Sequence, residues 1–380
     1  MSDDSIYDVI DEKILSLSHD SYLPLKERVS LRKRLMNSLR GFDVLEEFLH
    51  DPEVTEIMVN GYENIFIEKK GQIIKTELAF SSSEQLQNIV QQIVAFSNRR
   101  VNESNPIVDA RLKDGSRVNI VLNPIAINGP IITIRKFSNA PMSIDKLIEL
   151  DTITKEAADF LEKLVVSGYN IFVSGGTSSG KTTFLNVLSN FIPKEERVIT
   201  IEDSAELSLH NIDNLVRLEM RQANIEGLGE ITIRDLIHSA LRMAPTRLVI
   251  GEVRGPEAID MLQAMNTGHD GCMSTGHANS ANDMINRLST MSLTAMDIPL
   301  NAIKSQIASA IDIIIHLGRI NDRSRRVLEI VEIDKFDGHE IILNPIFTYD
   351  SQSGLIPTGN NLIHTTKLIR HGYNMTAFMN

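Results

Sequence analysis

The sequence contains one cysteine and no tryptophan in 380 residues. With Cys272 alone, the chain can form neither an internal disulfide nor a zinc site of CxxC pairs, so no zinc is expected. Long apolar runs are also missing, and the acidic start MSDDSIYDVIDEK lacks the basic and then apolar order of a signal peptide. These absences predict a cytoplasmic protein that neither spans a membrane nor is exported by that route.

Positive charge and aromatic side chains are scarce. The 38 basic residues are outnumbered by 50 acidic ones, the net charge is -12, and only 5% of the residues are aromatic. Proteins that bind nucleic acid need basic surfaces, and those that bind single strands also need aromatic side chains on which the bases stack. No stable nucleic-acid partner is therefore expected. One basic island, Leu25 to Arg40, is interpreted either as a docking surface for an acidic partner or lipid headgroups, or as a solvated helix face.

The order of the expected elements divides the chain into three parts. Residues 1–42 are predicted to form a helical extension. Residues 43–140 show short strands around one helix, which predicts a small α+β domain. Residues 141–380 open on Ser143 as a helix cap and continue with helices that alternate with buried strands, a pattern typical of a parallel α/β sheet. The predicted fold class is therefore α/β, preceded by a smaller domain.

One segment fits the pattern GxxxxGK[ST], follows an apolar strand and runs into a helix: Gly175-Gly176-Thr177-Ser178-Ser179-Gly180-Lys181-Thr182. Its glycines let backbone N–H groups turn toward an anion, and the helix N-terminus adds positive charge. Lys181 is expected to reach the outer phosphates and the Thr182 hydroxyl to ligate Mg²⁺, with Thr183 next on the same turn. The segment predicts a site for ATP and Mg²⁺.

Two other expected strands end in carboxylates. One runs into Glu202, Asp203 and Glu206, and the other runs into Glu252. Ligands of open α/β sheets bind at the carboxyl ends of the strands, where a carboxylate can position water or hold Mg²⁺ through water. Taken alone, an acidic loop is usually only solvated, and many buried strands end in an acid.

Two further segments carry imidazole and guanidinium groups. The glycine-rich stretch 266–280 is suited to lie close to a phosphate, and its His269 and His277 are interpreted as phosphate sensors. Metal binding by these two histidines is less favoured because no third ligand has a sensible spacing. Arg217 and Arg221 lie four residues apart, and guanidinium groups bind phosphate oxygens in a two-pronged way. Surface salt bridges are the alternative interpretation of these arginines.

Four ordered motifs resemble those of the secretion ATPase superfamily, the motors of type II and type IV secretion and type IV pilus assembly. They are GGTSSGKTT, TIEDSAEL, VRLEMRQANIEGLGEITIRDLIHSALRMAPTRLVIGEVRG and MNTGHDGCMSTGHANS. The CpaF-type ATPases of Tad/Flp pilus assembly are the branch that the sequence most resembles, from about Leu45 to about Leu317. The resemblance implies a RecA-like ATPase domain behind a smaller domain, nucleotide held between the two, and a homo-oligomeric ring, usually a hexamer.

The resemblance also implies roles for single residues and a partner. Glu206 corresponds to the carboxylate that activates water, Glu252 to the Walker B acid and His277 to the His-box residue. The matching arginines near the nucleotide are Arg217, Arg221, Arg111 and Arg117. The implied partner is an integral membrane platform protein that holds the motor at the inner face of the cytoplasmic membrane. The four-cysteine zinc module of many relatives cannot be present in this chain.

Three functional hypotheses follow from these residues. The leading one is an ATP-hydrolysing motor that works on a membrane-embedded machine. A nucleic-acid translocase or helicase on the same RecA-like core is the second, and the acidic composition counts against it. The third is a scaffold that binds ATP with negligible turnover, and the presence of Glu206, Glu252 and the arginines argues against it.

Overall fold

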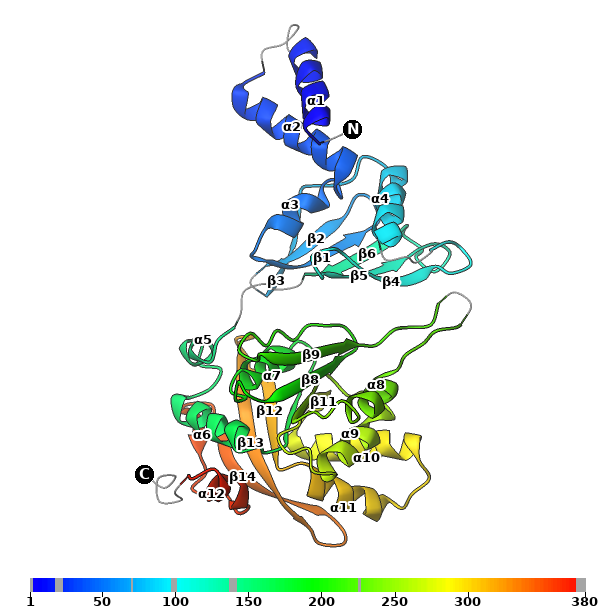
Figure 1. The fold of residues 1–380 in the computed structure, drawn as a ribbon. Coiled ribbons are helices and arrows are strands. Elements are labelled where there is room, and N and C mark those ends of the chain that lie inside the picture. The colour runs from blue at the N-terminus through cyan, green and yellow to red at the C-terminus, as the bar shows by residue number, and fades with distance from the viewer. Residues whose placement is uncertain are drawn as a thin grey trace. The chain divides into compact units, whose positions relative to one another are not determined.

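The computed structural model describes residues 3–17, 23–69, 71–96, 101–136, 142–224 and 227–373. The chain divides into two compact units, Met1–Ala140 and Pro141–Asn380 (Figure 1). Within the described residues, no helix combines the length and the apolar character that crossing a membrane requires.

The first unit begins with two neighbouring helices, α1 (Asp3–Leu17) and α2 (Leu25–Arg40). Their shared core is small, and Arg32 of α2 forms an ion pair with Asp11 of α1 at 3.0 Å. Three exposed cations of α2 recur every seven residues, which is about two helical turns, and so form one stripe: Lys26, Lys33 and Arg40. The predicted basic island is therefore a helix, and both interpretations of it stay open.

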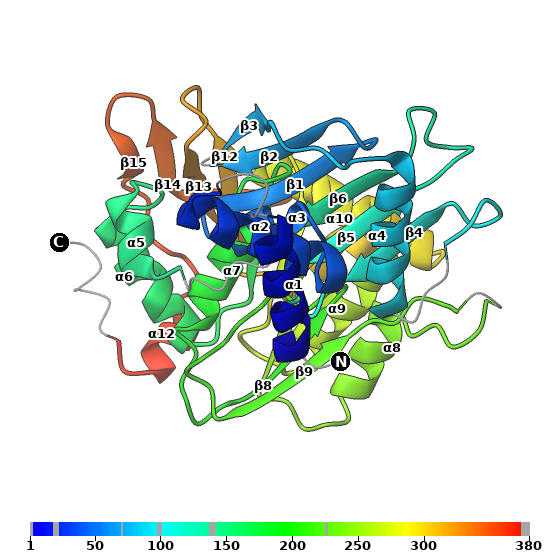
Figure 2. The ribbon, with the colours of Figure 1, turned by 90° about the horizontal axis from the view of Figure 1, so that it is seen from above.

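The rest of the first unit is an α+β layer. Its six strands are antiparallel in the order β3-β2-β1-β6-β5-β4, and α4 lies on one face (Figures 1 and 2). Alternate strand residues such as Val118 and Ile120 pack with Leu86 and Ile93 of α4 in the core. The bounds are α3 (Leu45–His50), β1 (Val54–Asn60), β2 (Ile65–Lys69), β3 (Gln72–Lys75), α4 (Ser83–Phe96), β4 (Ile107–Arg111), β5 (Arg117–Val121) and β6 (Ile131–Arg135).

The second unit contains a nine-stranded sheet in the order β15-β14-β13-β12-β7-β11-β10-β8-β9. The strands from β12 to β9 in this order are parallel, whereas β13, β14 and β15 extend the sheet in antiparallel fashion. The bounds are β7 (Ile171–Gly175), β8 (Arg197–Glu202), β9 (Asn214–Glu219), β10 (Arg247–Ile250), β11 (Met273–His277), β12 (Ile313–Arg319), β13 (Arg325–Phe336), β14 (Ile341–Asp350) and β15 (Gly354–Pro357).

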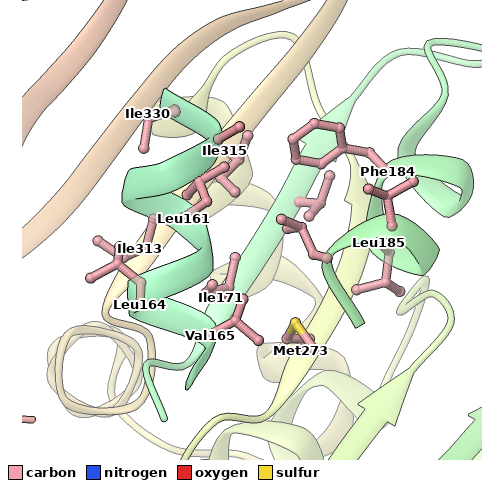
Figure 3. Close-up of a cluster of buried hydrophobic side chains, with 14 of the residues drawn as sticks. Leu161, Leu164, Val165, Ile171, Phe184, Leu185, Met273, Ile313, Ile315 and Ile330 are labelled. Carbon is pink, nitrogen blue, oxygen red and sulfur yellow. The ribbon is translucent and has the colours of Figure 1, made fainter. Parts of the chain in front are cut away.

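Helices cover both faces of this sheet. Ile171 and Val173 of β7 point to the side of α6 and α7, whereas Phe172 points to the side of α9, α10 and α11. Figure 3 shows the first of these cores, where Leu161 and Leu185 meet strand side chains. The bounds are α5 (Ile144–Glu149), α6 (Lys155–Val166), α7 (Lys181–Ser189), α8 (Ile233–Ala240), α9 (Glu257–Asn266), α10 (Ala281–Ala295), α11 (Leu300–Ala310) and α12 (Thr366–Arg370).

The alternation of helices and buried strands predicted from the sequence matches these elements, and Ser143 caps α5 by accepting the N–H of Lys146 at 3.1 Å. The antiparallel strands after β12 were not predicted. Their sequence carries no nucleotide-site motif, and the hairpins extend the sheet beyond the alternating part of the chain.

Asn170 precedes the central strand β7 and holds its start in place through two hydrogen bonds. Its amide donates to the carbonyl of Ala310 at 2.7 Å and accepts the N–H of Cys272 at 2.9 Å. Asn170→Ala leaves both buried backbone groups unpaired, at about 1–3 kcal/mol each. We expect urea denaturation to show a free energy of unfolding lower by about 3 kcal/mol.

The control is Asn266→Ala, because the Asn266 amide makes an exposed 3.2 Å bond to the Gln306 carbonyl. It should cost less than about 1 kcal/mol. Equal losses in the two variants would show that Asn170 does not fix β7.

Candidate nucleotide site

The predicted P-loop joins β7 to α7. Ser178 and Gly180 have left-handed φ values of 57° and 96°, and Gly180 is the N-cap of α7. Gly175 has no room for a side chain, since a Cβ there would lie 2.4 Å from the Leu317 carbonyl oxygen and 2.6 Å from Ser179 Oγ. The loop therefore closes tightly over the positive end of a helix.

The residues present fit a bound nucleotide. A polar cavity of about 510 Å³ opens beside the loop and is lined by Gly176, Thr177, His277, Ala278, Asn279, Asp283, Asn286, Arg287 and Thr290. The hydroxyl of Ser179 is buried and has no hydrogen-bond partner among the described residues. Thr182 is half-buried on the first turn of α7, where a hydroxyl ligand for Mg²⁺ is required, and Thr183 is exposed.

His277 connects the P-loop to the Walker B strand. Strand β11 lies between β7 and β10, so its last residue reaches the edge between Gly175 and Glu252. Lys181 Nζ donates to the Gly176 carbonyl at 2.9 Å and lies 3.2 Å from His277 Nδ1. His277 Nε2 lies 2.8 Å from Glu252 Oε1. The three side chains thus form one continuous polar connection.

The neighbours of His277 define its state. Burial lowers the pKa of His277, and the positive charge of Lys181 lowers it further. A neutral ring can accept from the ammonium group at Nδ1 and donate to the Glu252 carboxylate from Nε2. In this tautomer His277 accepts from Lys181 and places its other N–H 2.8 Å from Glu252 Oε1, which has no hydrogen-bond partner in the geometry of the described residues.

Arg254 joins the end of β10 to the acidic loop after β8. Its guanidinium lies 2.7 Å from Glu252 Oε2 and 3.3 Å from Asp203 Oδ2. Hydrogen bonding to Glu252 raises the pKa of Arg254, and the charges of Asp203 and Glu206 add to this effect. Glu206, which is half-buried, therefore lies within electrostatic range of the same cluster. Sequence reasoning assigned no role to Arg254.

Glu202 shapes the loop that carries Glu206. Its buried carboxylate accepts the N–H groups of Glu206 and Leu207 at 2.7 and 2.8 Å, and burial raises its pKa. Arg217 donates to the Leu207 carbonyl at 2.8 Å and lowers the Glu202 pKa in part. Arg217 thus contacts the acidic loop directly.

Arg221 and His269 make no contact with the P-loop or the acidic loop among the contacts of the described residues. Arg221 Nε donates to the Gly229 carbonyl at 2.6 Å, so its bond is to its own loop, and its role at the phosphates stays a prediction. His269 precedes β11 and therefore lies at the amino ends of the parallel strands, opposite the P-loop edge. This position excludes the interpretation of His269 as a phosphate sensor at the P-loop.

The arginines predicted in the first unit belong to a row. Arg111 of β4 lies opposite Arg117 of β5, and Arg117 lies opposite Arg135 of β6. Arg135 is 3.7 Å from Glu56. Directly opposite strand residues share one face, so the three guanidinium groups stand side by side. Sequence reasoning missed Arg135, although strand alternation places it on this face.

Among the described residues, no group of three or more His, Cys, Asp or Glu side chains is arranged to hold a metal ion. Mg²⁺ at a P-loop needs no such group, because a hydroxyl, phosphate oxygens and water supply most of its ligands. The assignment of Thr182 and Glu252 to Mg²⁺ stays a prediction.

The close packing at Gly175 generates a prediction for nucleotide affinity. In Gly175→Ala the added methyl group must displace the loop, and overpacking of this kind costs about 1–3 kcal/mol. ATP binding measured by calorimetry should weaken about ten- to a hundredfold. Thermal unfolding checks that the variant stays folded. An ATP affinity equal to that of the parent chain would contradict the packing argument.

A protein-family model described as "Type II/IV secretion system protein" matches residues 38–350. A Mycobacterium tuberculosis protein described as a candidate conjugal transfer protein is 32% identical over 311 residues, covering 80% of this chain and 88% of that protein. The type IV secretion system protein PtlH of Bordetella pertussis is 32% identical over 313 residues, covering 75% of this chain and 92% of that protein.

Solved structures share the fold. The ATPase DotB of Legionella pneumophila has a TM-score of 0.54 at 21% identity and covers 76% of this chain and 80% of its own. The pilus retraction motor PilT, solved with ADP, has a TM-score of 0.56 at 18% identity, with coverages of 87% and 86%. The predicted architecture of an α+β domain before an α/β P-loop domain is therefore confirmed.

The family match extends over parts of both units of the chain and includes the P-loop, the acidic loop, Glu252 and His277. The Tad/Flp branch is not distinguished by these matches and stays a prediction. As its motifs predicted, the chain belongs to the family of type II/IV secretion system proteins and is a member of the secretion ATPase superfamily.

Proposed function

We propose that the chain is an ATP-hydrolysing motor of a pilus-assembly or secretion machine and works as a hexameric ring. The observation that carries the proposal is the connection from Lys181 through His277 to Glu252, in a chain of the secretion ATPase superfamily. It links the group that would bind the outer phosphates to an acid of the hydrolysis site.

The P-loop is the segment proposed to bind ATP. The N–H groups at the start of α7 and the ammonium group of Lys181 face the place of the phosphates, and Thr182 offers a hydroxyl to Mg²⁺. Bound Mg²⁺ would neutralise the phosphate charge that develops during hydrolysis. Lys181 would exchange its present contact with the Gly176 carbonyl for phosphate oxygens.

Hydrolysis requires a group that orients and deprotonates water. Glu252 is already engaged by His277 and Arg254, which favours holding Mg²⁺ through water over accepting a proton. Glu206 is our candidate for the base, because Glu202 fixes the backbone of its loop close to Arg254. Arg217 and Arg221 are proposed to stabilise the phosphate charge, with Arg217 better placed beside the acidic loop.

The family match supports a proposal about the machine that the chain serves. Relatives named for type IV secretion and for conjugal transfer support a role in a membrane-spanning assembly. We propose a hexamer that contacts an integral membrane platform protein at the cytoplasmic face, and the Tad/Flp pilus system as the assembly served. The net charge of -12 counts against the alternative of a nucleic-acid translocase.

The assignment of Glu206 generates a kinetic prediction. Glu206→Gln should keep ATP affinity within about threefold and lose turnover by on the order of a hundredfold or more, because loss of a general base costs that much. Lys181→Ala should lose both affinity and turnover. Phosphate release and calorimetric ATP binding measure the two quantities.

Glu195→Gln is the matched control, since Glu195 is exposed between α7 and β8, at the opposite edge of the sheet. It should hydrolyse ATP at the normal rate. Normal turnover in Glu206→Gln would move the base to another carboxylate of the cluster.

A further inference from the structure

Two arginines far from the P-loop in sequence converge on its tip. Arg319 Nε of β12 donates to the Ser178 carbonyl oxygen at 3.1 Å, and Arg325 Nε of β13 donates to the same oxygen at 3.2 Å. The topology explains the convergence. Leu317 of β12 pairs with Gly175 of β7, and Arg319 is the register partner of Arg325.

Ser178, whose carbonyl accepts both bonds, has an unusual backbone conformation. Ser178 has a φ of 57°, a left-handed conformation that is unfavourable for serine and persists only where the surroundings impose it. Hydrogen bonds from charged donors are among the stronger ones, and two of them here hold one carbonyl. The arginines therefore add to the constraint that the Ser179 N–H and the Lys181 ammonium group impose by donating to the Gly176 carbonyl.

Fixing this carbonyl also fixes the donor on the other side of the same peptide bond. The N–H of Ser179 points away from the two arginines and donates to the Gly176 carbonyl oxygen at 3.3 Å, a bond that it would exchange for a phosphate oxygen. A P-loop binds phosphate through inward-facing N–H groups, so the orientation of this peptide decides whether one of them is available. The stem of Arg325 also packs near Gly180, where a Cβ would lie 3.3 Å from Arg325 Cδ.

We propose that Arg319 and Arg325 are positioning residues that hold the tip of the P-loop in its nucleotide-binding conformation. The antiparallel extension of the sheet thereby sets the affinity for the nucleoside triphosphate. The inference rests on the proposed function, because it assumes that the P-loop binds ATP. The inference gives the β12–β13 hairpin a role in nucleotide binding, although none of the sequence motifs lies in this hairpin.

The test compares Arg319→Gln, Arg325→Gln and the double variant with the parent chain. ATP affinity measured by calorimetry with Mg²⁺ should fall about tenfold in each single variant and about a hundredfold in the double variant. The kcat at saturating ATP should stay within about threefold, because bound ATP restores the loop. Arg325→Lys keeps a charged donor and should recover most of the affinity.

Arg326→Gln is the matched control. Arg326 is the next residue of β13, and its guanidinium donates to the Leu150 carbonyl at 2.7 Å instead of to the P-loop. Its affinity for ATP should equal that of the parent chain. If the double variant does not fold, as judged by its thermal unfolding, the two single variants decide the result.

Three results would overturn the inference. Parental affinity in the folded arginine variants would leave the proposed function standing and remove the positioning role. A fall in kcat at unchanged affinity would make the arginines contacts of the reaction instead. A parent chain that binds ATP no better than Lys181→Ala would end both the proposed function and the inference.

Discussion

The position of β11 between β7 and β10 is the constraint on which the site depends. Parallel strands end at one edge of the sheet, so this order places His277 between the P-loop and Glu252. The lysine and the carboxylate therefore both lie next to one imidazole. We propose that a phosphate bound at Lys181 changes the contacts of Glu252 through that ring.

Local sequence was enough to predict the P-loop and the carboxylates that follow β8 and β10. Each of these features is an apolar strand followed within a few residues by polar groups. Such a short pattern can be recognised in the sequence whatever the order of the strands in the sheet. The strand order was not predictable in this way. The contact between Lys181 and His277 joins residues 96 positions apart and depends on which strands pair.

The residues that sequence reasoning missed or misplaced share a physical cause. Arg254, Arg319 and Arg325 look like solvated arginines until the strand order and the β12–β13 register are known, which place them beside the acidic loop and the P-loop. The interpretation of His269 as a phosphate sensor was wrong because closeness to a motif in sequence does not show at which end of a strand a residue lies. The antiparallel strands after β12 thus contribute to a site whose motifs all precede them.

We propose that the chain couples ATP hydrolysis to a ring of identical subunits. The most direct test of this coupling is Mg²⁺-dependent ATPase activity across fractions separated by size, with and without nucleotide, and with single-stranded or duplex DNA added. We expect turnover to be confined to a species of about six chains and to be unaffected by DNA. Full turnover in the monomer, or strong stimulation by DNA, would contradict it.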